Sequence, residues 1–508
     1  MQLRFRVCDE LAPLAWCAQV NRSSACVTVT HGPWVETGPA GFVEGAWPGA
    51  FREFDFDGTH ALMGSGGKLA GARLVLSAPC HTLECLYLVR CGDALFASNS
   101  FAFLLAAAGL ALDADYHAYK NDLWSITHGL ERCVRELPTR GGPRVRLAHF
   151  CNLEITAALE IRERPKTVPE PWSDFDAYRR FLAGTLAAIA RNAAAAERRR
   201  TFSLLAGLSS GYDSAASAVL AAEAGCRHAF TFRSGVQLSP RAGVRVRADP
   251  ADDSGAFIAR MLGMDAAEFS REACRDASAR CFEEIAAAGD AFDFQFAALE
   301  RTLPGRLLVS GFNGDNIWDL LQQHPSPHFI RHTEPPTGTS LGEFRLRTGF
   351  VHCPVPFLGA VLHPAIHAIS RSPDMAPWTL NRDYDRPIPR RILEEKGVPR
   401  GSFARAKAGS FRALQAARRA ATGRADFEEA YRRHRGGLDP LRRAADEIIY
   451  LARRARARLT RWSERFGVPN PLAPLYYPDI PIPGRSSFIV PWGGAALRER
   501  YLRAIQSG

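Results

Sequence analysis

The sequence predicts an α/β protein whose second part is built around a doubly wound parallel sheet. Apolar runs of strand length at 202–206, 228–232 and 306–310 alternate with stretches of helical character. That order is typical of parallel strands joined by helical crossovers. Two of these runs lead into short loops of small residues that end in an acid, and parallel sheets bind ligands at the carboxyl ends of their strands.

The first segment of the chain, residues 1–162, is predicted to be a separate and β-rich domain. Its first six residues alternate polar and apolar side chains, as a half-buried strand does. Further short β-like runs are 25–30, 74–77 and 86–89. A Pro- and charge-rich stretch at 163–173 is the expected linker. Residues 174–508 then form the second domain.

Length and composition are those of a globular protein of more than one domain. The chain has 508 residues, of which 46% are hydrophobic and 23% charged, and two or three domains are expected at this size. No run reaches the roughly 18 apolar residues of a membrane span, and the N-terminus lacks the apolar core of a signal peptide. We therefore expect a cytoplasmic protein. The twelve cysteines form no Cys-x-x-Cys pair, which argues against zinc-ribbon and iron–sulfur sites.

The loop Ser209-Ser210-Gly211-Tyr212-Asp213-Ser214 is the most informative stretch of the chain. It follows the 202–206 run and precedes a helix-like segment, 215–223. A helix N-terminus presents unpaired backbone N–H groups and a positive dipole end, so this junction is suited to phosphate. The loop has no lysine and lacks the spacing of a Walker-type loop. Asp213 stands where a carboxylate could hold magnesium against bound phosphates.

A second loop of similar design follows about a hundred residues later. The run 306–310 leads into Ser310-Gly311-Phe312-Asn313-Gly314-Asp315-Asn316. Two strand ends that each deliver one aspartate make the pair needed to hold a magnesium ion bridging phosphate oxygens. The strand 228–232 should end at the same edge, which brings Phe232 to the predicted site.

Together the two loops resemble those of the asparagine synthetase family, a group of N-type ATP pyrophosphatases. The first is similar to the S-G-G-x-D-S motif, with Ser210 replacing a glycine. The second is similar to S-G-E-G-S-D-E, with Phe312 and Asn316 where glutamates often stand. The resemblance follows nearly the whole chain in order. It implies a degenerate N-terminal nucleophile-type α/β/β/α sandwich, then a doubly wound pyrophosphatase-loop (PP-loop) synthetase domain with a helical C-terminal part.

The resemblance also implies a site for ATP and Mg²⁺. Asp213 and Asp315 correspond to the family's two metal-holding aspartates. The residues expected to bind ATP are Ser209, Ser210, Gly211, Tyr212, Asp213, Ser214, Phe232, Ser310 and Gly311.

Two downstream segments supply the expected catalytic residues. Val351–Leu358 is similar to the family's V-E-A-R-V-P-F-L segment, with His352 in the place of the glutamate. An imidazole there could deprotonate an attacking amine, and the alternative is a histidine that only hydrogen-bonds a strand end. Phe403–Lys407 resembles the family's late basic loop, which implies that Lys407, supported by Arg405, stabilises the charge formed during amide closure.

One departure from the family narrows the chemistry. Glutamine-dependent members begin their mature chain with a cysteine, whereas this chain has Gln2, and the nearest thiol, Cys8, lies in an unrelated context. The N-terminal domain is therefore expected to lack glutaminase activity. The amine then belongs to the substrate, to a second substrate, or is free ammonia.

The resemblance implies an AMP-forming, ATP-dependent C–N ligase of natural-product biosynthesis. The glutaminase-deficient branches it resembles are β-lactam synthetases and lasso-peptide cyclases. The run Tyr384–Pro387, with Arg405 and Lys407, favours lasso-type macrocyclisation. Alternatives are amidation of a sugar carboxylate in polysaccharide assembly and a tRNA-modifying PP-loop enzyme. Expected partners are a carboxylate substrate and an amine, peptide or small molecule, with a partner biosynthetic protein as a further candidate; nucleic acid is not favoured.

The net charge of +11 is concentrated in the region 411–466, where arginines alternate with Ala and Leu at helical spacing. Long arginine stems can cover apolar surface, so a solvated helix face is the expected role, and the alternative is an electrostatic binding surface for an acidic partner or for RNA. Few aromatic residues lie among these arginines, which disfavours stacking on single-stranded nucleic acid. The Pro-rich stretch 468–489 is expected to be extended.

Overall fold

The computed structural model describes most of the chain. The described residues are 1–22, 24, 26–233, 236–237, 253–289, 291–322, 324–331, 337–404, 408–409, 423–466 and 484–507. The protein is mixed α/β, and the second part contains a fully parallel sheet, as predicted.

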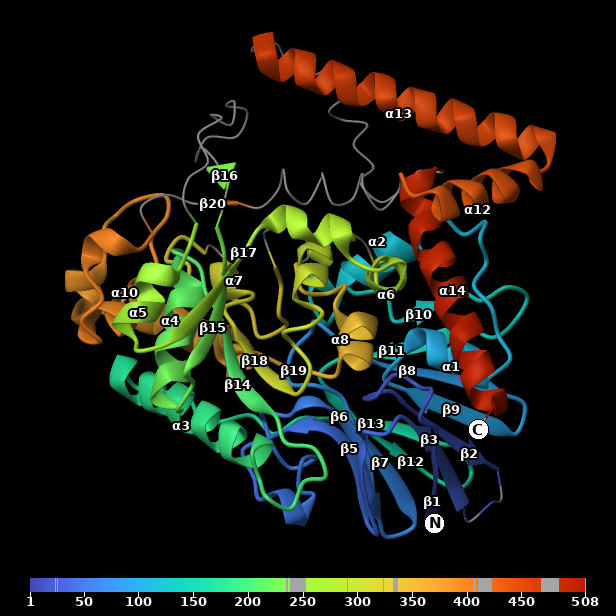
Figure 1. Cartoon of the computed structure of the whole chain (residues 1–508), viewed down its shortest axis with the longest axis horizontal. Helices are drawn as coiled ribbons and strands as arrows, with labels where there is room; N and C mark the ends of the chain where they lie inside the picture. The colour runs from blue at the N-terminus through green and yellow to red at the C-terminus, as the bar shows by residue number, and fades with distance from the viewer. Residues whose placement is uncertain are drawn as a thin grey trace.

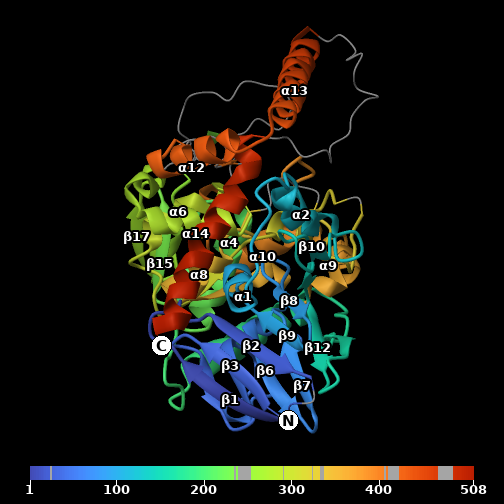
Figure 2. The same cartoon turned by 90° about the vertical axis from the view of Figure 1, so that its right-hand side faces the viewer.

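The N-terminal part contains two sheets (Figures 1 and 2). In spatial order, the seven-stranded sheet consists of β1 (Gln2–Val7), β3 (Cys26–His31), β2 (Trp16–Asn21), β9 (Ala94–Ser98), β8 (Leu86–Cys91), β11 (Val145–Ala148) and β10 (Glu136–Leu137). The six-stranded sheet consists of β13 (Ile161–Pro165), β12 (Cys151–Ile155), β7 (Arg73–Ser77), β6 (Met63–Ala70), β5 (Gly41–Ala46) and β4 (Glu36–Gly38). All neighbouring strands are antiparallel except β1 and β3.

The two N-terminal sheets share a buried hydrophobic cluster. In β3 buried and less buried residues alternate, whereas β2 and β7 are buried at most of their positions. Trp16 of the first sheet packs edge-on against Phe42 of the second at a centroid distance of 5.0 Å. The predicted runs 74–77 and 86–89 fall in strands of these sheets, as do residues 26–30 of the predicted run 25–30, whose first residue lies outside the described part of the chain.

The third sheet lies in the second part of the protein and is entirely parallel. Its spatial order is β17 (Asp265–Phe269), β15 (His228–Phe232), β14 (Ser203–Gly207), β18 (Arg306–Ser310) and β19 (Val351–Pro354). The chain therefore adds strands on one side of β14 and then crosses to the other side with β18. In doubly wound sheets, the carboxyl ends at such a reversal are where ligands bind.

Helices cover this sheet and connect the parts of the molecule (Figure 1). The helices are α1 (Phe101–Ala107), α2 (Tyr119–Trp124), α3 (Phe175–Ala193), α4 (Tyr212–Glu223), α5 (Ala256–Met261), α6 (Ala279–Ala287), α7 (Gly314–Ile317), α8 (Gly342–Thr348), α9 (His363–Ser370), α10 (Pro387–Glu395), α12 (Ala425–Gly436), α13 (Pro440–Phe466) and α14 (Arg485–Ser507). A short pair, β16 (Val236–Gln237) and β20 (Ala408–Gly409), lies apart from the large sheets. No described helix is both long and apolar enough to cross a bilayer.

Helix α3 begins after an N-cap residue, Asp174. The Asp174 carboxylate accepts a hydrogen bond from the backbone N–H of Ala177 at 2.8 Å, which pairs one of the free donors of the first turn. Helix α4 packs against both β14 and β18, and its small residues, such as Ala215 and Ala216, are fully buried. This packing fixes α4 at the strand reversal, the point between β14 and β18 where the order of strand addition changes direction.

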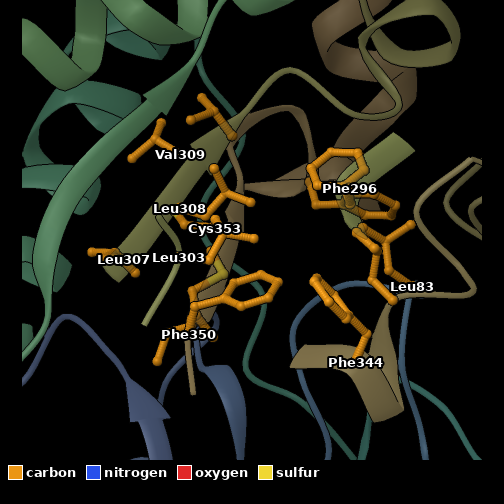
Figure 3. Close-up of a cluster of buried hydrophobic side chains, with 14 of the residues drawn as sticks. Leu83, Phe296, Leu303, Leu307, Leu308, Val309, Phe344, Phe350 and Cys353 are labelled. Carbon is orange, nitrogen blue, oxygen red and sulfur yellow. The ribbon is translucent and has the colours of Figure 1, made fainter. Parts of the chain in front are cut away.

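Buried side chains from both parts of the chain form one core. Figure 3 shows Leu83, from the N-terminal part, beside Phe296 and Phe344 in the same cluster as Leu308 of β18 and Cys353 of β19. The C-terminal helix α14 adds a second connection, since the ring of Tyr501 stacks on Phe103 at 4.9 Å. Strands β18 and β19 of the parallel sheet therefore share a core with the N-terminal part of the chain.

Two boundaries differ from those expected. The predicted linker 163–173 begins inside β13, which ends at Pro165 and pairs with β12, and Lys166 is buried. The predicted extended stretch 468–489 lies outside the described residues up to 483, and its end, from Arg485, belongs to α14. Phe488 and Ile489 are buried there. Burial of these side chains overrides the extended character suggested by the prolines.

Candidate functional site

The two predicted loops meet at the strand reversal. A cavity of about 300 Å³ opens at the carboxyl ends of β14, β15 and β18. Its lining includes almost every residue predicted to bind nucleotide or metal: Ser209, Gly211, Tyr212, Asp213, Ser214, Phe232, Ser310, Gly311 and Asp315. The parallel pairing of β14 with β18, from Ser203 opposite Arg306 onwards, sets this arrangement.

The first loop is fixed by its own hydroxyl groups. The Ser214 Oγ accepts a hydrogen bond from the backbone N–H of Ser209 at 3.1 Å and lies 2.7 Å from the Ser209 Oγ. The Ser209 Oγ in turn accepts from the N–H of Gly211 at 3.2 Å. Gly211 is the N-cap residue of α4, so the first turn of this twelve-residue helix faces the cavity. Its N–H groups make the cavity floor attractive to anions.

Ser210 differs from its neighbours because it does not line the cavity. Its backbone connects the loop to two other segments. The N–H donates to the carbonyl oxygen of Asp253 at 3.0 Å, and the carbonyl accepts from the N–H of Ala404 at 2.8 Å. Ser210 stands where the motif that this loop resembles has a glycine, and these two hydrogen bonds are made by its main-chain atoms.

The second loop presses against the first at two glycines. A Cβ added to Gly311 would lie 2.4 Å from the carbonyl carbon of Asp213 and 2.4 Å from the nitrogen of Ser214. A Cβ on Gly314 would lie 2.4 Å from the Asp213 Cγ. Both distances are shorter than any real contact, so only glycine permits this approach. Asp315 follows Gly314 directly, which brings the second carboxylate to the same cavity.

Arg386 forms an ion pair with Asp213, although it was not predicted as a site residue. Its Nη1 donates to the Asp213 Oδ2, and its side chain is 2% exposed. Burial works against the charged guanidinium, but Asp213, followed by Tyr384 and Asp315, raises the pKa of Arg386 above its usual range. Asp385 fixes the preceding turn by accepting from the N–H of Leu380 and of Asn381. Arg386 therefore keeps its charge and gives this end of the cavity a fixed cation.

Arg331 is a second cation, half-buried, on the Asp315 side of the site. Burial lowers its pKa to about 10, while Asp315 and Asp293 act in the opposite direction. At that pKa the guanidinium is charged at neutral pH. Asp293 is itself fully buried and accepts from the N–H of Gly338 at 2.9 Å and from the Ser340 Oγ at 2.6 Å. Each of the two aspartates predicted to bind metal therefore interacts with an arginine: Asp213 with Arg386 and Asp315 with Arg331.

The remaining wall of the cavity is aromatic. Phe232, Phe230, Phe296 and Phe312 all line it, and consecutive members of this series have centroid distances of 5.9, 6.3 and 5.8 Å. Such a wall offers π-faces and apolar surface to a planar ring system. A polar floor and an aromatic wall together suit a ligand with a phosphate chain and a flat base.

A polar group at the cavity margin was also missed by the sequence analysis. The Arg271 Nη2 donates to the Asp253 Oδ2 at 2.7 Å, and its Nη1 donates to the Gln295 Oε1 at 2.5 Å. The Arg271 guanidinium lies 5.0 Å from the centroid of Phe232. No motif marks these three residues, because they come from separate segments that only the fold brings together. The Tyr384–Pro387 run did indicate the segment of Arg386, but not its role.

His352 lies behind the cavity rather than on its lining. It is 2% exposed, and its Nε2 is 2.7 Å from the Ser310 Oγ. Burial, with smaller effects of His81 and Arg345, holds the pKa of His352 well below its usual range. The imidazole is therefore neutral at pH 7. A proton from an amine in the cavity would have to pass the Ser310 hydroxyl to reach it, so a role in positioning Ser310 fits this geometry better than direct proton transfer.

Lys407 and Arg405 lie outside the described residues, so their predicted role stays a prediction. The chain before them is anchored to the site: Ala404 bonds to Ser210, and the Phe403 ring lies 5.8 Å from that of Tyr212. After them, β20 pairs with β16, close in sequence to the end of β15.

The donor set fits magnesium only in company with phosphate. Carboxylate oxygens of Asp213 and Asp315 are the hard ligands that Mg²⁺ prefers. Within the described part of the chain, no group of three or more His, Cys, Asp or Glu side chains could hold a metal ion alone. The phosphate oxygens of a nucleotide would have to complete the coordination, as in other Mg²⁺–nucleotide sites.

Comparison with known proteins does not assign the chain to a family. No protein-family model matches the chain, and no curated protein matches it either.

Proposed function

We propose that the protein is an ATP-dependent C–N ligase that adenylates a carboxylate, releases pyrophosphate and transfers the acyl group to an amine. The observation that carries this proposal is the meeting of two aspartates, from loops about a hundred residues apart, in one cavity at the strand reversal. The polar floor and aromatic wall of that cavity add support, because they match the two halves of ATP in chemistry.

The proposed fold assignment is finer than the mixed α/β class. The parallel order around β14 and β18 supports a PP-loop synthetase domain, with the α4 N-terminus as its phosphate loop. The two N-terminal sheets that share a core support a degenerate N-terminal nucleophile-type sandwich.

Several residues that line the cavity would then each contact a defined part of ATP. The base would lie against Phe232 and Phe230, and the phosphates at the first turn of α4 beside Ser209 and Ser214. Magnesium, when bound, would neutralise the leaving pyrophosphate. Asp213 and Asp315 would hold the ion, which requires Asp213 to exchange Arg386 for it.

If Asp213 exchanged its ion pair with Arg386 for the metal ion, Arg386 would gain a function. Once Asp213 turns to the metal, the guanidinium remains charged and buried beside the phosphate site. A fixed cation there stabilises negative charge as it develops, without reorganisation of solvent. Lys407 is proposed for the same task at the acyl group, with Arg405 in support. We propose that the amine belongs to the substrate itself or to a second substrate, or is free ammonia.

ATP–pyrophosphate exchange tests this proposal. The purified protein should incorporate labelled pyrophosphate into ATP in a Mg²⁺-dependent reaction that a cognate carboxylate stimulates. A panel of carboxylates, including peptides with Asp or Glu side chains, tests the favoured lasso-type chemistry. Asp315→Asn should reduce exchange by about a hundredfold or more, with unchanged thermal stability as the control for folding. Exchange at the wild-type rate in that variant would contradict the proposal.

A further inference from the structure

Helix α13 stands apart from the body of the protein. Figures 1 and 2 both show it at one extreme of the molecule, beyond α12 and away from the three large sheets. Its first turns are tied to the body, since the Arg442 Nη1 lies 3.0 Å from the Asp115 Oδ2 and Asp446 lies 3.7 Å from His117. Of the described side chains from Leu441 to Leu459, all but that of Asp446 are exposed.

Most large apolar residues of this helix lie along one stripe, and Ile449, which is 38% exposed, lies beside it. At 100° per residue, the positions of Leu441, Ile448, Leu451 and Leu459 fall in one sector of roughly 120°. The same sector takes up Ala444, Ala445, Ala452, Ala455, Trp462 and Phe466. Leu441 is 82% exposed, Ile448 67% and Leu451 52%. Large apolar side chains aligned on an exposed face mark an interaction surface.

The rest of the helix surface is strongly basic. The sequence of α13 has eight arginines and only three carboxylates: Arg442, Arg443, Arg453, Arg454, Arg456, Arg458, Arg461 and Arg465 against Asp446, Glu447 and Glu464. Every one of these charged positions falls outside the apolar sector. Arg458, which is exposed, falls next to one edge of the sector, where a long side chain can extend along an apolar surface while its charge stays in water.

We propose that α13 is an interfacial helix that binds the surface of an anionic lipid membrane. An apolar stripe opposite an arginine-rich face is the pattern of helices that lie in the headgroup region, with the stripe toward the acyl chains. Positive charge on the other face is complementary to acidic headgroups. The body of the protein leaves the face exposed from Leu441 to Leu459, so a flat surface can reach it without a matching groove.

Other acidic partners would contact a smaller part of the α13 surface. A nucleic acid would pair with the arginines but would leave Leu441, Ile448 and Leu451 in water. The membrane uses both faces of the helix at once. The inference does not depend on the ligase activity proposed above, because no residue of α13 lines the cavity.

Vesicle co-sedimentation of the full chain tests the inference. One set of vesicles contains phosphatidylcholine alone and the other contains about 30% phosphatidylglycerol, which supplies the anionic surface. The wild-type protein should sediment with the anionic vesicles only, and less at high salt. Ile448→Asp should weaken this binding by about tenfold or more, because it places a charge in the stripe.

Ile449→Asp is the matched control. It introduces the same charge one residue away, outside the apolar sector, so its binding should stay within about threefold of wild type. Helicity and thermal unfolding of both variants check that the fold is unchanged. Failure of the wild type to bind anionic vesicles, or an equal effect of the two substitutions, would overturn the inference. So would binding to RNA, to polyglutamate or to a second copy of the chain without binding to vesicles.

Discussion

At the scale of single residues, the site depends on glycine as much as on aspartate. Asp213 and Asp315 share a cavity because Gly311 and Gly314 let one loop lie directly on the other. The sequence indicates both aspartates through their strand-loop-acid context. It does not indicate that the neighbouring glycines are required by contact, since that contact joins segments far apart in the chain. The Arg386 ion pair escapes sequence analysis for the same reason.

Substitution of Gly314 tests this close approach. The Cβ of Gly314→Ala would meet the Asp213 side chain at 2.4 to 2.7 Å, so Asp213 must move. We expect a loss of ATP–pyrophosphate exchange of about a hundredfold, since small misplacements at a reacting centre have effects of that size. Gly184→Ala in α3 is the control, because its Cβ would meet nothing within 4 Å, and it should keep full exchange. Near-wild-type exchange in Gly314→Ala would show that Asp213 need not be held in this position.

Lys407→Met tests the predicted closure residue. A cation at the acyl group stabilises charge that appears only as the amine attacks, so the variant should form amide at least about a hundredfold more slowly. ATP binding, measured by equilibrium dialysis, should change far less. Amide formation within a few-fold of wild type would remove Lys407 from this role.

At the scale of the elements, the strands of the parallel sheet could be predicted well. The runs 202–206, 228–232 and 306–310 appear as β14, β15 and β18 with shifts of at most one residue. These strands are largely buried and therefore read as continuous apolar runs. The linker expected at 163–173 begins inside β13, and the end of the stretch 468–489 belongs to α14. Strand pairing and burial decide the structure at those residues, although prolines and charges dominate the local composition. The coupling of His352 on β19 to Ser310 on β18 also needed the fold.

Substitution of His352 distinguishes positioning from proton transfer. Its neutral imidazole is within hydrogen-bonding distance of Ser310 at the end of the neighbouring strand. Because burial holds the pKa of His352 well below its usual range, the imidazole is neutral at pH 7 and should produce no limb in the pH profile near neutrality. We expect His352→Gln, which can also hydrogen-bond Ser310, to form amide within about tenfold of wild type, and His352→Phe to lose more.

The opposite result would restore the base role. If His352→Gln retains pyrophosphate exchange but loses amide formation entirely, the imidazole acts on the amine proton. The measurement is a pair of assays on one preparation, exchange for the first half-reaction and product formation for the second.

At the scale of the whole molecule, buried charges connect the N-terminal part to the parallel sheet. Arg345 of α8 is 1% exposed and forms ion pairs with Glu44 of β5 and with Glu84, both at 2.7 Å. Glu343 on the same helix accepts a hydrogen bond from the Ser100 Oγ at 2.8 Å. Removing one partner of such a group leaves a buried charge uncompensated, which costs about 3 to 5 kcal/mol. The two parts are therefore expected to unfold together.

Glu343 makes this connection sensitive to pH. Burial raises its pKa from 4.5 to about 7, so the folded state holds a proton that the unfolded state releases. The stability this gives is complete below pH 4.5 and is lost as the pH rises to about 7. Glu343→Gln, which mimics the protonated acid, should gain stability relative to wild type by up to about 3 kcal/mol between pH 5 and pH 8. Denaturant unfolding at the two pH values measures this difference, and a pH-independent difference would contradict the assignment.

The central claim is that Asp213 and Asp315 together hold one metal–nucleotide complex at the strand reversal. A crystal structure of the protein with a non-hydrolysable ATP analogue and Mn²⁺, located by its anomalous signal, tests it most directly. The expected result is a single ion bound by both carboxylates at about 2.0 to 2.2 Å, the phosphates at the N-terminus of α4, the base against Phe232, and Arg386 released from Asp213. A nucleotide bound elsewhere, or an ion that contacts neither aspartate while the Arg386–Asp213 pair persists, would contradict the claim.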